Sequence, residues 1–209
     1  MNNKILLASS SPYRKTLLSQ LGLAFDSHSP NIDESPKEHE SAEQLAKRLS
    51  FEKAQACQDK YPDHFIIASD QVCCLQESDK QILLSKPGNA ERAYQQLRLC
   101  NNKRVDFYTG LCLLPPVNLT TSIDKQLHQQ KSVSRFSVKF RALDDSEILN
   151  YVQLEKPFDC AGSFKVEGLG MHLFESLEGE DQNSLIGLPL LNLCKMLRAV
   201  NISPLVAKP

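Results

Sequence analysis

The sequence predicts a single α/β domain, because short apolar runs typical of buried strands alternate with segments of helical periodicity. The chain has 209 residues, which suits one large domain or two small ones. The runs Ile5–Leu7 and Phe65–Ala68 are typical of buried strands. Residues 41–57 show helical spacing and begin with a predicted capping box of Ser41 and Gln44.

Composition narrows the class of partner. Hydrophobic residues make up 41% of the chain and charged residues 23%, as is usual for a soluble globular protein. The net charge of -1 gives no general attraction to nucleic acid or to an anionic membrane, and no apolar run has the length of a membrane span. Seven cysteines without a CxxC pair, after a start without a signal-peptide pattern, predict reduced thiols in the cytoplasm.

The first strand and helix, within residues 5–22, form a candidate anion site. Ser11 is a suitable N-cap, and Pro12 fits the first helical position. Free N–H groups and the positive end of the helix dipole favour an anion there. Arg14 and Lys15 lie in the first turn, where the dipole disfavours cations, and a bound phosphate would resolve that conflict. The alternative is an ordinary capped helix with two solvated basic residues.

Lys53 lies on the apolar stripe of the second helix. Leu45, Leu49 and Lys53 are four residues apart and therefore share one face. A lysine seldom lies on such a face without a partner. Two interpretations stay open: the side chain reaches past the last turn into solvent, or its ammonium is directed toward an anion in a cleft.

Asp70 is the best catalytic candidate that the residues alone indicate. It stands between the apolar strand segments 65–68 and 72–75, where an unpaired carboxylate is costly to bury. Such a group must be paired, bind a metal or carry a shifted pKa. Glu34, in the acidic loop 31–36, either contributes oxygen to a divalent cation or belongs to a solvated turn.

The same signals predict the other elements. We expect a turn at 76–80, a strand at 82–84, a helix from Asn89, a strand at 104–114, an exposed loop or hairpin tip at 115–131, an edge-like strand at 133–141, a helix at 144–155, close backbone approach in the glycine-rich segment 159–170, a strand at 171–177 and a helix at 190–200.

Several catalytic classes are excluded. The sequence has no GxxxxGK[ST], GxGxxG, HExxH or GxSxG motif, and its five histidines show no metal-ligand spacing. Two carboxylates, Glu34 and Asp70, and three cations, Arg14, Lys53 and Lys86, remain near strand ends and helix starts. This combination suits phosphoanhydride hydrolysis, which needs charge neutralisation, positioning and a base for water.

Eight motifs in order resemble the Maf family of nucleotide pyrophosphatases over nearly the whole chain. They are LASSSPYRKTLL at 7–18, NIDES at 31–35, FEKAQA at 51–56, SDQV at 69–72, SKP at 85–87, YTG at 108–110, CAGSFKVEGLG at 160–170 and GLPL at 187–190.

The resemblance implies an α/β fold, similar to that of ITPases, with an elongated mixed β-sheet, flanking helices and two lobes around a nucleotide cleft. Residues 1–209 would form one such domain, with a longer loop at about 115–131. It also implies a homodimer that hydrolyses a nucleoside triphosphate to the monophosphate and pyrophosphate with a divalent metal, Mg, Mn or Co.

By position, the resemblance makes Asp70 the general base and assigns metal binding to Glu34 and Asp70. The implied phosphate contacts are Ser9, Arg14, Lys53 and Lys86.

Three positions that sort substrates within the family are Tyr13, Gln71 and Glu167. The branch that acts on dTTP and UTP has Arg, Thr and Gln there, so this chain instead resembles the 7-methyl-GTP pyrophosphatase branch. An aromatic face attracts the positively charged methylated guanine, and a carboxylate accepts its N–H groups. The alternatives are the same chemistry on dTTP or UTP, and a nucleotide-binding regulator of septum formation without relevant catalysis.

Overall fold

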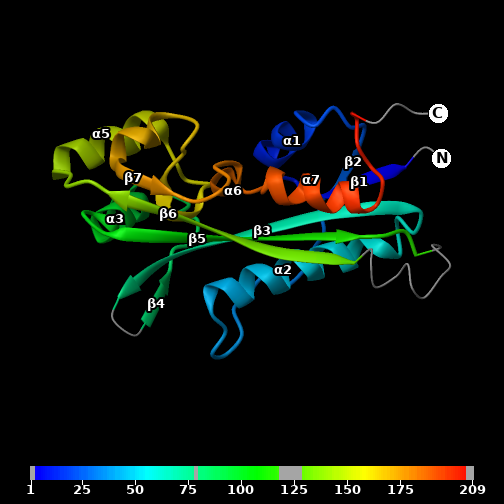
Figure 1. Cartoon of the computed structure of the whole chain (residues 1–209). Helices are drawn as coiled ribbons and strands as arrows, with labels where there is room; N and C mark the ends of the chain where they lie inside the picture. Colours follow the sequence, from blue (N-terminus) through cyan, green and yellow to red (C-terminus); the bar gives the residue numbers. More distant parts are fainter. Residues whose placement is uncertain (1–2, 78–79, 118–128, 206–209) are drawn as a thin grey trace.

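The computed structural model describes residues 3–77, 80–117 and 129–205. Within these residues, a mixed seven-stranded sheet with flanking helices forms the fold, which confirms the predicted mixed α/β class (Figure 1). The strands are Lys4–Ala8 (β1), Asp26–His28 (β2), His64–Glu77 (β3), Lys80–Leu83 (β4), Arg104–Leu114 (β5), Gln130–Phe140 (β6) and Phe174–Glu178 (β7). Their order is β2-β1-β3-β5-β6-β7, and β4 also pairs with β3.

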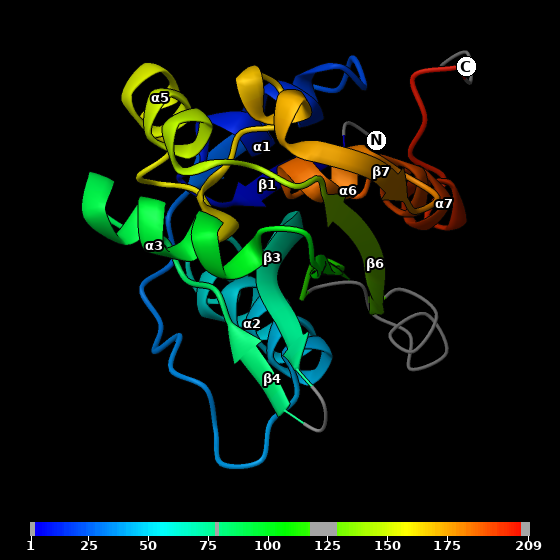
Figure 2. The ribbon, with the colours of Figure 1, turned by 90° about the vertical axis from the view of Figure 1, so that its left-hand side faces the viewer.

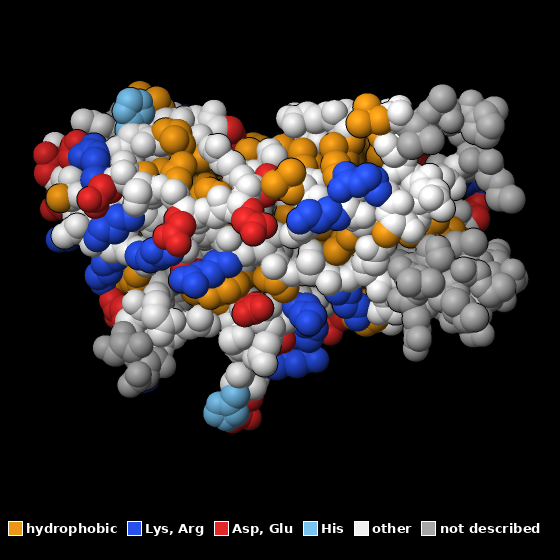
Figure 3. Space-filling model, viewed as in Figure 1, with side chains coloured by type: hydrophobic (Ala, Val, Ile, Leu, Met, Phe, Trp, Pro, Cys, Tyr) orange, Lys and Arg blue, Asp and Glu red, His pale blue; other side chains and the backbone are white. Residues whose placement is uncertain are grey.

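Helices cover both faces of this sheet. They are Pro12–Ser19 (α1), Ala42–Gln58 (α2), Ala90–Cys100 (α3), Asp145–Glu155 (α5), Asn183–Ile186 (α6) and Leu190–Ala199 (α7), with short 3-10 turns at Ala161–Ser163 (η1) and Leu169–Leu173 (η2). Figures 1 and 2 show α2 on one face and α1, α5, α6 and α7 on the other. The predicted capping box of Ser41 and Gln44 is present, and Ser11 caps α1 as expected. Figure 3 shows Lys and Arg side chains interspersed with Asp and Glu, in keeping with the small net charge.

The long central strand β3 has an opening along one edge. On its other edge, β5 pairs with residues 66–75. On the open edge, β1 pairs with residues 64–67 and β4 with residues 74–77. Between these two pairings, the open edge of residues 68–73 pairs with no strand among those described. The ends of β1 and β4 therefore face each other across a gap with the middle of β3 between them.

Several predicted boundaries were wrong around β3 and β6. The apolar segments on either side of Asp70 belong to one continuous strand, because its other edge stays paired with β5. The predicted turn at 76–80 is shorter, since Glu77 already pairs with Lys80. Strand β6 begins at Gln130 and pairs with both β5 and β7, so it is not the expected edge strand.

Other expectations concern the loop and the glycine-rich segment. Of the predicted loop 115–131, residues 118–128 lie outside the described residues. Residues 171–173 are in η2 rather than in the predicted strand. Close backbone approach is confirmed, and the atoms approached are the chain's own. A Cβ on Gly162 would lie 3.0 Å from the Cys73 sulfur, and one on Gly170 would lie 2.3 Å from a backbone carbonyl oxygen.

Separate apolar clusters pack toward the two ends of the sheet. One cluster includes Phe107, Phe140 and Ile148, and another includes Leu7, Leu18 and Leu193. This arrangement accords with two lobes, although the division of the single domain stays a prediction.

All seven cysteines are free thiols and five are buried, as expected for small apolar residues. Within the described ranges, no helix combines the length and apolar character that a membrane span requires.

Candidate active site

A cleft of about 610 Å³ opens where the edge of β3 is unpaired. Residues 8–14 line it from the end of β1 and the start of α1, and residues 83–86 line it from the end of β4. Asp70 and Gln71 form part of its floor. The volume lies in the range of small-molecule pockets. The topology thus brings a strand–helix junction, a second loop and the middle of β3 to one place.

The ammonium of Lys53 joins the two carboxylates of the cleft. Strand alternation directs Asp70 toward α2, and helical spacing places Lys53 on the face of α2 that meets it. Lys53 Nζ donates to Asp70 Oδ1 and lies 2.7 Å from Glu34 Oε1. Lys53 is 8% exposed and Asp70 is 6% exposed. Of the two interpretations of Lys53, the structure therefore supports the one with an anionic partner in a cleft.

Burial and neighbouring charges shift the pKa values of Asp70 and Arg14 in opposite directions. Burial raises the pKa of the Asp70 carboxyl above its usual range, while Lys53 and Arg14 oppose the rise. Burial also lowers the pKa of the Arg14 guanidinium, while Asp70 and Glu34 oppose that shift. An arginine nevertheless stays protonated in proteins. The carboxylates and the cations consequently interact as one charged cluster.

The predicted anion site lies beside this cluster. The Ser11 side chain accepts a hydrogen bond from the backbone of Arg14 at 3.4 Å, and Ser9 Oγ accepts one from Ser11 N at 3.1 Å. Arg14 Nε donates to the Gly187 carbonyl at 2.9 Å, which fixes the guanidinium at the cleft wall. Lys86 is exposed and lines the cleft after β4. Each predicted phosphate contact thus borders the same cavity.

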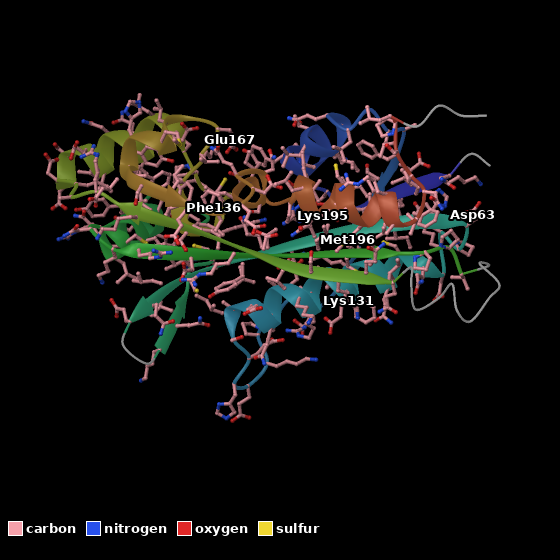
Figure 4. The ribbon with its side chains drawn as sticks, in the orientation of Figure 1. Asp63, Lys131, Phe136, Glu167, Lys195 and Met196 are labelled. Carbon is pink, nitrogen blue, oxygen red and sulfur yellow. The ribbon has the colours of Figure 1, made fainter. Side chains whose placement is uncertain are left out.

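The three predicted specificity residues are only partly brought together. Tyr13 and Gln71 line the cleft, whereas Glu167 is exposed and is not among the lining residues. Figure 4 shows Glu167 above the sheet, on the segment between α5 and β7. Burial raises the pKa of the Tyr13 phenol to about 12, and Cys160, Asp159 and Glu167 add to the rise.

The loop that carries Glu34 is held by Arg48, a residue that sequence reasoning missed. Arg48 binds both oxygens of Glu40 at 2.7 and 2.8 Å and donates to the Ser35 carbonyl at 2.9 Å. The hydrogen bond from Arg48 lowers the pKa of Glu40 to about 2. Spacing offered one signal, because Arg48 and Glu52 are an i, i+4 pair on α2.

The donor set suits a metal that is shared with a substrate. Carboxylate oxygens of Asp70 and Glu34 converge on one ammonium, so two oxygen ligands lie within reach of one point. Within the described ranges, no group of three or more His, Cys, Asp or Glu could hold a metal ion. Mg²⁺ is commonly bound by one or two carboxylates together with waters and substrate phosphates. The residues fit that mode rather than a cage made only of protein ligands.

Other cleft neighbours were quoted only as parts of motifs. Thr109 and Gly187 belong to the YTG and GLPL motifs, and each contacts a cleft residue or the turn beneath it. Their role depends on contacts between β3, β5 and α6, which periodicity within one segment does not reveal.

Comparison with known proteins gives an independent result. Residues 4–200 match the family described as Maf-like protein. A Pseudomonas aeruginosa protein named 7-methyl-GTP pyrophosphatase is 51% identical over 193 residues, which cover 92% of this chain and 94% of that protein. The structure of the Staphylococcus aureus Ham1 protein covers 96% of this chain and 100% of its own, with 13% identity and a TM-score of 0.50. At that identity the likeness concerns the fold alone.

Glu40→Gln should weaken the attachment of the Glu34 loop. The depressed pKa means that Glu40 stabilises the fold above its ordinary pKa of 4.5 and loses this effect as pH falls toward about 2. We expect the free energy of unfolding in urea to fall by about 1–3 kcal/mol at pH 7, since the bond is charge-assisted. The deficit should shrink as pH is lowered through 4 to 3. Glu38→Gln, at an exposed neighbour, is the control, and equal stability of Glu40→Gln and the native chain at pH 7 would contradict the assignment.

Proposed function

The chain belongs to the Maf family, and from that premise we propose that it hydrolyses 7-methyl-GTP to 7-methyl-GMP and pyrophosphate. The observation that carries the proposal is the contact of the buried Lys53 ammonium with the buried Asp70 and with the more exposed Glu34, beside Arg14, in one cleft. Two carboxylates and several cations at one point suit a phosphoanhydride, whose cleavage needs neutralised charge and an activated water. The relative named 7-methyl-GTP pyrophosphatase supports the choice of substrate.

The phosphates are proposed to bind at the start of α1. Ser9 and Ser11 shape the junction, and the free N–H groups of the first helical turn favour an anion. Arg14 donates from the cleft wall, and Lys86 approaches from the opposite rim. A triphosphate in this position also removes the unfavourable placement of Arg14 near the positive end of the helix dipole.

Asp70 is proposed as the base that accepts a proton from the attacking water. Burial moves its pKa upward, toward neutral pH, which makes the carboxylate a better base. Lys53 keeps the carboxylate oriented through its hydrogen bond, and Lys53 and Arg14 neutralise charge that develops on the phosphates. Glu34 and Asp70 would hold a divalent metal, Mg, Mn or Co, which would neutralise phosphate charge and polarise the phosphoryl oxygens.

The nucleobase of the substrate is proposed to lie against Tyr13. Burial is the main cause of the raised pKa of the Tyr13 phenol, and the charges of Cys160, Asp159, Glu167 and Glu155 add to it. A negative environment around an aromatic face favours a positively charged base over a neutral uracil or thymine. Methylation at N7 gives guanine such a charge. Among nucleotides with this chemistry, the surroundings of Tyr13 therefore favour the methylated one over dTTP or UTP.

We also expect a homodimer that acts in the cytoplasm. Family resemblance is the basis for the dimer, and seven free thiols support a reducing compartment. A nucleotide-sized cleft supports a small-molecule substrate in place of nucleic acid.

Asp70→Asn should abolish turnover while leaving the fold intact. Removal of a general base typically lowers kcat by a factor of about 100 to 10,000. Pyrophosphate release from 7-methyl-GTP with Mg, Mn or Co measures the effect. Asp106→Asn is a matched control, because Asp106 is a buried carboxylate on the adjacent strand that pairs with Arg135 outside the cleft.

Wild-type kcat in Asp70→Asn would refute the assignment of the base. Tight binding without pyrophosphate release from any triphosphate would instead favour a regulatory role.

Tyr13→Ala should remove the preference for the methylated base. Stacking on an aromatic side chain is worth about 1–3 kcal/mol, so kcat/KM for 7-methyl-GTP should fall by about tenfold or more. Tyr13→Phe keeps the ring face and should retain most of the activity. A panel of 7-methyl-GTP, GTP, dTTP and UTP gives the comparison. Higher kcat/KM for dTTP than for 7-methyl-GTP in the native chain would refute the proposed substrate.

A further inference from the structure

The turn that follows α6 presents backbone carbonyls to two cleft residues. Helix α6 has only four residues, and the N–H of its capping residue Gly187 bonds to the carbonyls of Asn183 and Ser184. Gln71 Nε2 donates to the carbonyls of Ser184 and Leu185 at 2.8 and 3.0 Å. Arg14 Nε donates to the Gly187 carbonyl at 2.9 Å. Carbonyls from one short turn are thus bonded to a predicted base contact and a predicted phosphate contact.

Buried hydroxyls from the sheet complete this arrangement. Thr109 Oγ1 donates to the Ser184 carbonyl at 2.8 Å and accepts from Gln71 Nε2 at 3.3 Å. Ser69 Oγ lies 2.8 Å from the Gly187 carbonyl. Both hydroxyl residues are fully buried, so water does not compete for these bonds. Strands β3 and β5 therefore meet the turn with donors matched to its carbonyls.

The turn itself is firmly held. Asp181 accepts from the backbone N–H of Asn183 at 2.9 Å and of Leu191 at 2.8 Å, which ties α6 to the start of α7. Gly187 has a φ of +117°, a conformation that favours glycine. A Cβ at Gly187 would lie 3.2 Å from Arg14 Nε. A side chain there would disturb both the turn and the guanidinium.

We propose that residues 184–187 form a positioning element that orients Arg14 and Gln71 together, with Gly187 and Thr109 as its positioning residues. This inference rests on the proposed roles of Arg14 and Gln71 in nucleotide binding. Because Nε of Arg14 is bonded to the turn, its terminal N–H groups are left for phosphate. Because the amide nitrogen of Gln71 is bonded to carbonyls, its amide oxygen is the atom that meets the base.

This orientation makes Gln71 an acceptor in the base pocket. A guanine presents N–H donors on its Watson–Crick edge, and these match an amide oxygen. A variant that releases the amide would allow it to rotate and offer its nitrogen instead. The element would therefore favour a donor-bearing base on one side and a phosphate on the other.

The proposed orientation of Arg14 by the turn is tested with Gly187→Ala. Calorimetry with inorganic tripolyphosphate should show Kd raised about tenfold, since a small displacement of a positioned group lowers its contribution strongly. Gly22→Ala is the control, because Gly22 has a φ of +65° but nothing lies within 4 Å of its added Cβ. In an Arg14→Ala background, Gly187→Ala should cause no further loss. Unchanged Kd in the single variant, or an equal loss in both backgrounds, would overturn the proposed orientation of Arg14.

The proposed orientation of Gln71 is tested with Thr109→Val, which removes the hydroxyl and keeps the shape of the side chain. The ratio of kcat/KM for 7-methyl-GTP to that for dTTP should fall about tenfold, as expected when a base-reading group loses its orientation. Thr109→Ser keeps the hydroxyl and should retain the ratio. A merely structural role would lower kcat/KM equally for 7-methyl-GTP and dTTP. An unchanged ratio in Thr109→Val would therefore overturn the proposed orientation of Gln71.

Failure of the proposed function is distinguishable from failure of this inference. If the native chain releases pyrophosphate from no triphosphate, the proposed function fails, while tripolyphosphate binding still tests the orientation of Arg14. A native chain that does not bind tripolyphosphate would overturn the inference itself.

Discussion

The contact of the Lys53 ammonium with Asp70 and Glu34 is the interaction on which the cleft depends. Two carboxylates that share a site repel each other, and a cation between them removes that repulsion. Removing one partner of a buried ion pair typically costs about 3–5 kcal/mol, because the remaining charge stays buried and unpaired. Helix α2 must therefore pack against β3 in the one register that brings Lys53 to Asp70.

The sheet explains why such a costly group is tolerated in the middle of a strand. Asp70 lies where β3 is paired on one edge only, between the ends of β1 and β4. That opening admits a ligand to the strand itself, so the carboxylate is buried by the protein yet borders a cavity. Strand alternation sends Asp70 toward α2 and its neighbour Gln71 toward α6. The proposed general base and a proposed nucleobase contact thus lie on opposite faces of one strand.

Much of the fold could be predicted from the sequence, because the signals for helix starts and buried strands are local. Capping residues such as Ser11 and Ser41, and the apolar run before Asp70, depend on neighbours within a few residues. Alternation in β6 predicts an edge strand wrongly, because alternation of buried residues does not reveal a second pairing partner. The sequence did not reveal the hydrogen bonds of Arg48 to Glu40 or those to the carbonyls of the α6 turn. Each of them forms only when a loop or a helix packs onto another element.

The central claim is that one cleft holds the triphosphate against Asp70 and the base against Tyr13. A crystal structure with a 7-methyl-GTP analogue whose α–β bridge is a methylene group, and hence not hydrolysed, tests it most directly. We predict the α–β bridge beside Asp70 and Lys53, the phosphates on Arg14 and Lys86, and the base on the Tyr13 ring. An analogue bound outside the cleft, or with its base away from Tyr13, would contradict the account.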